Sequence, residues 1–211
     1  MSQHQPEIVK AVLDDCLQGL GLDYLDLYLI HFPASFVASS RNVGEDLFPL
    51  TGKNEPEGDV AIDDSVSIVD TWEAMTMLPK SKTRSIEVSN FTIQHLETII
   101  NAAGVAPAAN QVEHHPLLRQ DDLIAYCKNR NIHIIAYSIG GQSVIPKSVI
   151  SACIRENFQE VILSPQDIAE VESVGKVQKR YNAPFIANKP RWDVNSFGDD
   201  AEKNASHHVI L

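Results

Sequence analysis

The stretch that decides the fold class is Leu22-Asp23-Tyr24-Leu25-Asp26-Leu27-Tyr28-Leu29-Ile30-His31-Phe32-Pro33. From residue 25 onward it is an almost unbroken apolar run, and a proline closes it. An apolar run of this length that ends at a proline predicts a β-strand buried on both faces. Such strands occur in parallel sheets whose two faces are covered, so the stretch indicates an α/β protein.

The residues on either side alternate between helical and strand patterns. Before the strand, apolar residues recur at helical spacing over residues 6–18, and Gly19 and Gly21 follow as a stop signal. After it, helices are predicted around residues 66–75, 96–100, 120–129 and 164–174, and strands around 84–88, 108–112 and 132–137. Strands that alternate with helices predict parallel βαβ units and hence an α/β fold.

One junction breaks this alternation. Only Ser138-Ile139-Gly140-Gly141 lie between the strand that ends at Tyr137 and the next apolar run, at residues 143–146. Parallel neighbouring strands need a crossover of about a dozen residues or more. Either the second run is not a parallel strand, or the chain has lost a helix here.

The composition of the chain limits the kinds of partner and the cellular compartment that we expect. The chain has 211 residues, of which 44% are hydrophobic, and a formal net charge of −11. Such a surface repels phosphate backbones and anionic lipid, which argues against nucleic acid and membrane as partners. No signal-peptide pattern opens the sequence, and its three cysteines are too scattered for a disulfide framework. We therefore expect a cytoplasmic protein.

Histidines are the residues that could suggest a metal site. His114 and His115 are adjacent, and His95 and His133 lie nearby in the sequence. Adjacent histidines rarely ligate one ion well, and no spacing of carboxylate and histidine supports a site. We expect no metal.

Five blocks, each at a predicted strand end, carry a resemblance to the aldo-keto reductases. They are residues 22–33, Val88-Ser89-Asn90-Phe91, Asn110-Gln111-Val112-Glu113-His114-His115-Pro116, Ala136-Tyr137-Ser138 and Val144-Ile145-Pro146-Lys147-Ser148. The chain resembles a fungal-like, NADPH-dependent member that acts on small aldehydes or sugars. The resemblance implies a (β/α)₈ barrel whose site lies at the carboxyl ends of the strands. It also implies that residues 1–175 form barrel and 176–211 a C-terminal tail or loop of the same domain.

The resemblance also assigns roles to individual residues. His31 matches the histidine that orients the substrate carbonyl, and Phe32 beside it lines the substrate pocket. Ser89, Asn90 and Gln111 match the side chains that hold the nicotinamide carboxamide. Without the family, Ser89 and Asn90 would be interpreted as a turn or helix cap, and His31 as a histidine bound to backbone.

The remaining matches concern the rest of the cofactor. Tyr137 matches the ring that stacks on the nicotinamide, and Ser138 a contact to the pyrophosphate. Lys147 and Ser148 match the pair that binds the 2′-phosphate of NADPH. The adenine contacts match Glu156 and Asn157.

The sequence departs from the family pattern in several places. In the family, about 80–90 residues precede the first block, with the first three strands and the catalytic tyrosine, aspartate and lysine. The junction after Tyr137 indicates loss of the helix between the last two strands. Cys153 stands where an arginine usually binds the 2′-phosphate, and Glu87 where a glycine is typical. We therefore expect an incomplete barrel whose exposed edges invite self-association.

Two classes of function remain open. The family implies NADPH-dependent reduction of an aldehyde or ketone to the alcohol. Loss of the general acid alone removes an effect of about 10²–10⁴-fold. The alternatives are a non-catalytic nucleotide-binding or interaction module, or a non-functional fragment.

Overall fold

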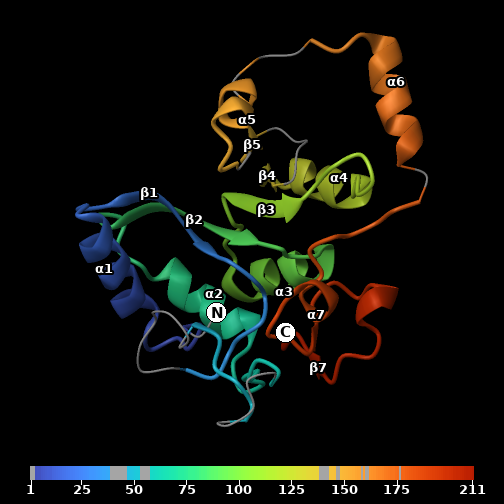
Figure 1. The fold of residues 1–211 in the computed structure, drawn as a ribbon. Coiled ribbons are helices and arrows are strands. Elements are labelled where there is room, and N and C mark those ends of the chain that lie inside the picture. Colours follow the sequence, from blue (N-terminus) through green and yellow to red (C-terminus); the bar gives the residue numbers. More distant parts are fainter. Residues whose placement is uncertain are drawn as a thin grey trace.

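The main structural element is an open, parallel, five-stranded sheet, seen in a computed structural model that describes residues 3–38, 47–52, 58–137, 143–145, 148–157, 159, 162–175 and 177–211. Its strands lie in the order of the chain, and all neighbours are parallel (Figure 1). They are β1 (Leu25–Ile30), β2 (Thr83–Ser89), β3 (Ala109–Glu113), β4 (His133–Tyr137) and β5 (Ser143–Val144). The parallel α/β fold predicted from the sequence is confirmed.

Helices precede or link the first four strands at the predicted places. They are α1 (Val9–Leu20), α2 (Ile68–Thr76), α3 (Ile93–Ala103) and α4 (Asp121–Asn129). Side-chain capping boxes begin α2 at Ser67 and α3 at Thr92. Gly21 and Gly104 end α1 and α3 with a φ of 67°, a conformation that glycine adopts without strain.

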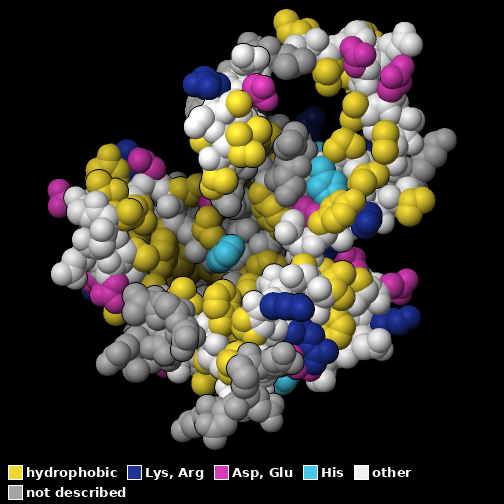
Figure 2. Space-filling model, in the orientation of Figure 1, with side chains coloured by type: hydrophobic (Ala, Val, Ile, Leu, Met, Phe, Trp, Pro, Cys, Tyr) yellow, Lys and Arg dark blue, Asp and Glu magenta, His cyan; other side chains and the backbone are white. Residues whose placement is uncertain are grey.

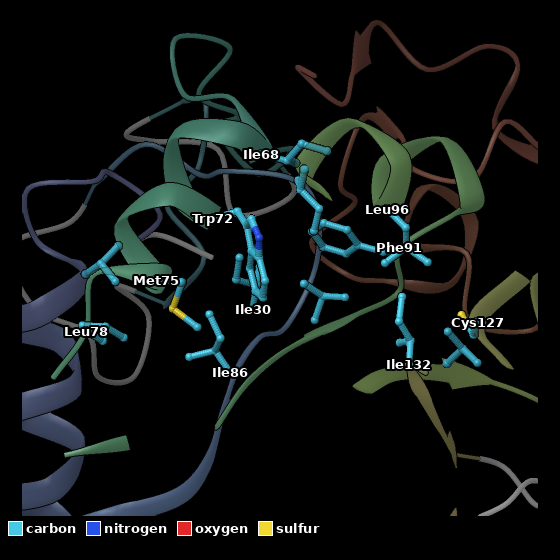
Figure 3. Close-up of a cluster of buried hydrophobic side chains, with 14 of the residues drawn as sticks. Ile30, Ile68, Trp72, Met75, Leu78, Ile86, Phe91, Leu96, Cys127 and Ile132 are labelled. Atoms are coloured by element: carbon cyan, nitrogen blue, oxygen red, sulfur yellow. The ribbon is translucent and has the colours of Figure 1, made fainter. Parts of the chain in front are cut away.

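The main hydrophobic core lies between these four helices and one face of the sheet. Trp72 of α2 is fully buried against strand residues such as Ile30 and Ile86 (Figure 3). Its indole N–H donates a 3.0 Å hydrogen bond to the carbonyl of Val105, which satisfies the polar atom of this buried side chain. The core therefore holds the strands, and with them their carboxyl ends, in a fixed register.

The other face of the sheet is only partly covered. Leu27 of β1 exposes 38% of its surface, and its neighbour Asp26, whose side chain points to the opposite face of the strand, is exposed as well. The prediction that β1 is buried on both faces is therefore wrong. The physical reason is that β1 is an edge strand of a sheet that does not close within the described residues. Figure 2 shows the resulting hollow between the part that carries α1 and β1 and the part that carries α5.

The run after the short junction is a parallel strand. Ser143 and Val144 of β5 pair with Ile135 and Ala136 of β4, and the Ile145 N–H donates to the Ala136 carbonyl at 3.0 Å. The alternative that this run is not a parallel strand is therefore wrong. The connecting residues 138–142 lie outside the described part of the chain. Five residues are too few for a helical crossover, so the alternative that a helix is lost here stands.

Two further helices follow the sheet, α5 (Ser151–Glu156) and α6 (Pro165–Val174). Helix α6 lies in the predicted range 164–174; Ser164 caps its beginning, and a proline stands in its first turn. None of the helices in the described ranges is long and apolar enough to span a membrane.

The C-terminal residues 177–211 contain short elements. They are α7 (Pro184–Ala187), β6 (Val194–Asn195), the 3-10 helix η2 (Asp200–Glu202) and β7 (His207–His208). Trp192 and Val194 pack with Phe32 and Phe36 in a second buried cluster, at the carboxyl end of β1. The Val60 N–H, in the segment between β1 and α2, donates to the Arg191 carbonyl at 2.8 Å. The tail is thus packed against the strand ends, while its division from the barrel at residue 175 stays a prediction.

Candidate active site

Six residues that the sequence singled out line one cavity of about 470 Å³. They are His31, Phe32, Ser89, Asn90, Gln111 and Tyr137. Five of them lie at or just beyond the carboxyl end of a strand, and Gln111 lies two residues before the end of β3. Ser89 is paired with Gln111, and Glu113 with Tyr137, so these ends form one continuous rim. Parallel packing therefore brings together side chains that lie far apart in the sequence.

Asn90 is the centre of the hydrogen-bond network at this rim. Its backbone has a φ of 66°, which asparagine tolerates better than most residues. Its Nδ2 donates to the His31 carbonyl at 2.9 Å and to Ser89 Oγ at 3.1 Å. Its Oδ1 accepts a 2.5 Å hydrogen bond from the Tyr137 hydroxyl. The Asn90 side chain therefore ties together the ends of β1, β2 and β4.

Ser89 and Gln111 offer complementary polar groups beside it. Ser89 is buried, and its hydroxyl donates to the Gln111 backbone carbonyl at 2.8 Å. The Gln111 side chain is half-buried and lines the cavity. Its amide has no hydrogen-bonding partner among the described residues. Because an amide carries both a donor and an acceptor, Gln111 can bind a ligand amide in either sense.

His31 lies at the open rim of the cavity. Partial desolvation lowers the pKa of its imidazole from the ordinary 6.5, so the neutral form predominates at pH 7. A neutral imidazole still has one N–H to donate. The Phe32 ring stands edge-on to His31, with 6.3 Å between ring centroids, and packs against Trp192 at 5.2 Å. The two residues thus present a donor and an apolar wall side by side.

The Tyr137 ring completes the described set. It is half-buried, and burial raises the pKa of its phenol far above neutral pH. The phenol therefore stays protonated and acts as the donor to Asn90. Its ring is held in place from two sides, by the strand and by this hydrogen bond.

The C-terminal segment adds cavity residues that sequence reasoning missed. They are Asn182, Pro184, Ala187, Asn188, Lys189 and Trp192, to which the earlier loop adds Phe48. One signal was available, because Trp192 is a large aromatic residue in a tail that the sequence did not assign to the site. Its packing against Phe36, with 5.0 Å between ring centroids, explains the position of this wall.

Three of the residues matched to the phosphate and adenine contacts are described by the structure, and these three, Ser148, Glu156 and Asn157, do not line this cavity. Ser148 precedes α5, and its hydroxyl accepts from the Ile150 N–H at 3.0 Å. Glu156 and Asn157 lie at the end of α5 and are exposed, and Cys153 of the same helix is half-buried. Ser138 and Lys147 lie outside the described residues.

Glu87 lies two residues before Ser89 on β2 and is 1% exposed. Its Oε2 has no hydrogen-bond partner in the described part of the chain. Burial raises the pKa of this carboxyl to about 7 from an ordinary 4.5. A carboxyl in such a place is neutral in mildly acidic solution, which limits the free-energy cost of burying it.

Two groups of observations bear on possible metal binding. Among the described residues, no group of three histidine, cysteine or acidic side chains is placed to hold an ion. The His115 ring instead contacts Glu113, with 2.9 Å between Nε2 and Oε1. The adjacent His114 and His115 therefore do not share a described ligand cluster.

Comparison with known proteins shows which family has a similar sequence. The model of the aldo/keto reductase family matches residues 1–184. A D/L-glyceraldehyde reductase of Hypocrea jecorina is 43% identical over an alignment of 254 positions, which covers 100% of this chain and 74% of that protein. The alignment is longer than the 211 residues here, so the relative has internal stretches without a counterpart. Loss of a helix after Tyr137, which the short junction predicts, would leave one such stretch in the relative.

Two further relatives agree. The glycerol 2-dehydrogenase (NADP⁺) of Saccharomyces cerevisiae is 44% identical over 68% of this chain and 45% of its own length. The aldose reductase structure from Giardia lamblia superposes with a TM-score of 0.76 at 30% identity, covering 89% of this chain and 74% of that chain. The sequence match, the strand order and the shared fold agree, and the chain belongs to the aldo/keto reductase family.

Proposed function

We propose that this chain binds NADPH and reduces a small aldehyde or sugar carbonyl to the alcohol. The observation that carries the proposal is the convergence of Ser89, Asn90, Gln111 and Tyr137 with His31 on one cavity. Relatives named as a glyceraldehyde reductase and an NADP⁺-dependent glycerol 2-dehydrogenase support both the cofactor and the size of the substrate.

The residues present fit the nicotinamide end of the cofactor. A carboxamide needs donors and acceptors together, which the Ser89 hydroxyl and the amides of Asn90 and Gln111 supply. The Tyr137 ring offers a flat apolar face for the pyridine ring. A cavity of about 470 Å³ lies within the usual range for ligand sites. The proposed contacts to the phosphates and adenine, Ser138, Lys147, Ser148, Glu156 and Asn157, rest on the family resemblance.

The proposed chemistry assigns separate tasks to cofactor and protein. NADPH, when bound, would supply a hydride to the carbonyl carbon, and solvent water would supply the proton that the carbonyl oxygen takes up. Neutral His31 donates a hydrogen bond to that oxygen and so orients the substrate. Phe32 provides the apolar wall beside it. In the same proposal the protein is cytoplasmic, which its three free cysteines support.

A second candidate function is nucleotide binding without turnover. The observation that favours it concerns which side chain could donate a proton to the carbonyl oxygen. The Tyr137 phenol already donates to Asn90, and its raised pKa makes it a poor acid at neutral pH. Lys189 is the one ammonium group among the described residues that line the cavity, and it is exposed. A site with bound cofactor but no efficient acid would bind NADPH and reduce carbonyls slowly or not at all.

Single-turnover absorbance measurements separate the two candidates. The purified chain, first shown to bind NADPH, is mixed with D-glyceraldehyde, and nicotinamide absorbance at 340 nm is followed. Reduction predicts a decay that His31→Ala slows by about 10²-fold or more without weakening NADPH binding. Binding without any decay supports the second candidate. Absence of both contradicts the whole proposal.

A further inference from the structure

The cavity has a wall that belongs to no strand of the main sheet. We call residues 182–192 the C-terminal wall; its only regular element is the four-residue helix α7. The strands that follow it, β6 and β7, pair with each other in the described structure. The ladder of the main sheet therefore does not hold the wall in place, and other contacts must do so.

Glu113 makes the contacts at the beginning of the wall. This residue ends β3 and is 1% exposed. Its Oε1 accepts a hydrogen bond from the Tyr181 N–H and its Oε2 one from the Asn182 N–H, both at 2.9 Å. Hydrogen bonds to an ionised acceptor are about twice as strong as neutral ones. One buried carboxylate thus holds two successive peptide groups at the place where the chain enters the cavity.

Neighbouring side chains reinforce this attachment. Gln120, just before α4, donates from Nε2 to the Glu113 backbone carbonyl at 2.6 Å. Its Oε1 accepts from Arg180 Nη2 at 3.3 Å, and Arg180 Nε donates to Asp199 at 2.7 Å. The residue immediately before Tyr181 is therefore tied to the same strand end as Glu113.

The far end of the wall is attached separately. The Arg191 guanidinium forms a two-point pair with Asp59, in which Nε lies 3.0 Å from Oδ1. The Arg191 carbonyl accepts from the Val60 N–H at 2.8 Å. Trp192 then packs edge-on to Phe32 and Phe36. The wall is thus fixed at both ends, and its position over the cavity depends on both.

We infer that Glu113 is a positioning residue, which holds Tyr181 and Asn182 so that the C-terminal wall closes the cavity that His31 and Tyr137 line. The inference rests on the proposed function only where it concerns the binding of substrate. Glu113 does not line the cavity, so it acts through the backbone that it binds.

The chain offers a matched control on the adjacent strand. Glu87 of β2 is as buried as Glu113, but it has an oxygen without a partner in the described chain and no hydrogen bond to the wall. Replacing either carboxylate by glutamine changes the same chemical group at the same depth. A glutamine at 113 keeps one acceptor oxygen and places an NH₂ donor opposite the other N–H group, so in the same orientation it accepts from only one of the two.

Fluorine NMR of the protein labelled with 5-fluorotryptophan tests the inference without any need for activity. The chain has two tryptophans, Trp72 in the helix-facing core and Trp192 in the wall, which Trp192→Phe assigns. We expect Glu113→Gln to shift or broaden the Trp192 resonance and leave Trp72 unchanged. Glu87→Gln should leave the Trp192 resonance unchanged. An unchanged Trp192 signal in folded Glu113→Gln would overturn the inference.

Hydrogen exchange of the unaltered protein covers the case in which Glu113→Gln fails to fold. The Tyr181 and Asn182 amides should exchange at least about tenfold more slowly than exposed loop amides, because each is bound to a buried carboxylate. Exchange at the rate of a free loop, while β3 remains protected, would overturn the inference.

Kinetics separate positioning from general destabilisation wherever the chain turns over. Glu113→Gln should raise the KM for D-glyceraldehyde about tenfold, with kcat within about threefold of the original, because a displaced wall loosens substrate binding first. A fall in kcat at unchanged KM would contradict the proposed role. If the chain shows no turnover, the proposed reduction fails, and the fluorine and exchange results still decide the role of Glu113.

Discussion

The Tyr137 hydroxyl donates a 2.5 Å hydrogen bond to Oδ1 of Asn90, which joins the end of β4 to the end of β2 across β3. The amide nitrogen of Asn90 donates its hydrogens to the His31 carbonyl and to the Ser89 hydroxyl. The Asn90 side chain is therefore occupied by the protein itself. In the proposed complex, a nicotinamide carboxamide would share or replace these hydrogen bonds of Asn90. The Gln111 side chain can bind it without first breaking a hydrogen bond to another described residue.

The two parts of the Tyr137 side chain can be tested separately. Tyr137→Phe removes the donor to Asn90 but keeps the ring, so we expect about 1 kcal/mol less stability and NADPH affinity within about threefold. Tyr137→Ala also removes the stacking surface and should weaken NADPH binding about tenfold. Thermal melts and nucleotide titrations measure both. Equal losses of affinity in the two variants would argue against the stacking role.

Glu87 should make stability depend on pH. Its folded pKa of about 7 lies above the ordinary 4.5, so the native state binds more protons than the unfolded state between these values. The free energy of unfolding should therefore fall as pH rises from about 4.5 to 7 and stay lower above that. The full effect is up to about 3 kcal/mol. Urea denaturation at pH 5 and pH 8 measures this difference. The free energy of unfolding should change less between the two pH values in Glu87→Gln than in the original chain.

The matched control for this experiment is Glu97→Gln, which alters an exposed glutamate of α3. It should reproduce the pH dependence of the original chain. If Glu87→Gln also follows the original curve, the carboxyl of Glu87 titrates as it does in the unfolded chain, and the shift described here is absent.

The open sheet should promote self-association. Leu27 exposes 38% of its surface on the edge strand β1, where the neighbouring backbone groups are also available for pairing. We expect light scattering to show a mass that rises with concentration, and Leu27→Lys to reduce it. Met77→Lys, which replaces a residue 83% exposed at the end of α2, should not. Equal effects of both substitutions would indicate unspecific association through exposed apolar surface.

Segments with a helical or strand pattern were predictable from the sequence. The contacts of segments without such a pattern were not. Helix α6 lies in the predicted range 164–174, because capping by Ser164 and helical periodicity are local properties. The burial of β1 was misjudged, because an apolar run does not tell an edge strand from a central one. The pairing of β5 was left open, since its two residues carry too little pattern.

The candidate site shows the same division. The strand-end motifs predicted His31, Ser89, Asn90, Gln111 and Tyr137, which parallel strand packing brings to one rim. The C-terminal wall has no periodic signal. Its position depends on contacts distant in sequence, such as the Glu113 carboxylate with the Asn182 N–H. No local pattern predicts that contact.

The most direct test of the central claim is an NADPH titration of the purified chain, followed by nucleotide fluorescence, with Gln111→Leu and Lys147→Ala beside it. We expect saturable, micromolar binding that both substitutions weaken, Gln111→Leu at the nicotinamide and Lys147→Ala at the 2′-phosphate. NADH should be affected by the first substitution alone. An absence of saturable binding by a chain that melts cooperatively would contradict the claim that these strand ends form a cofactor site.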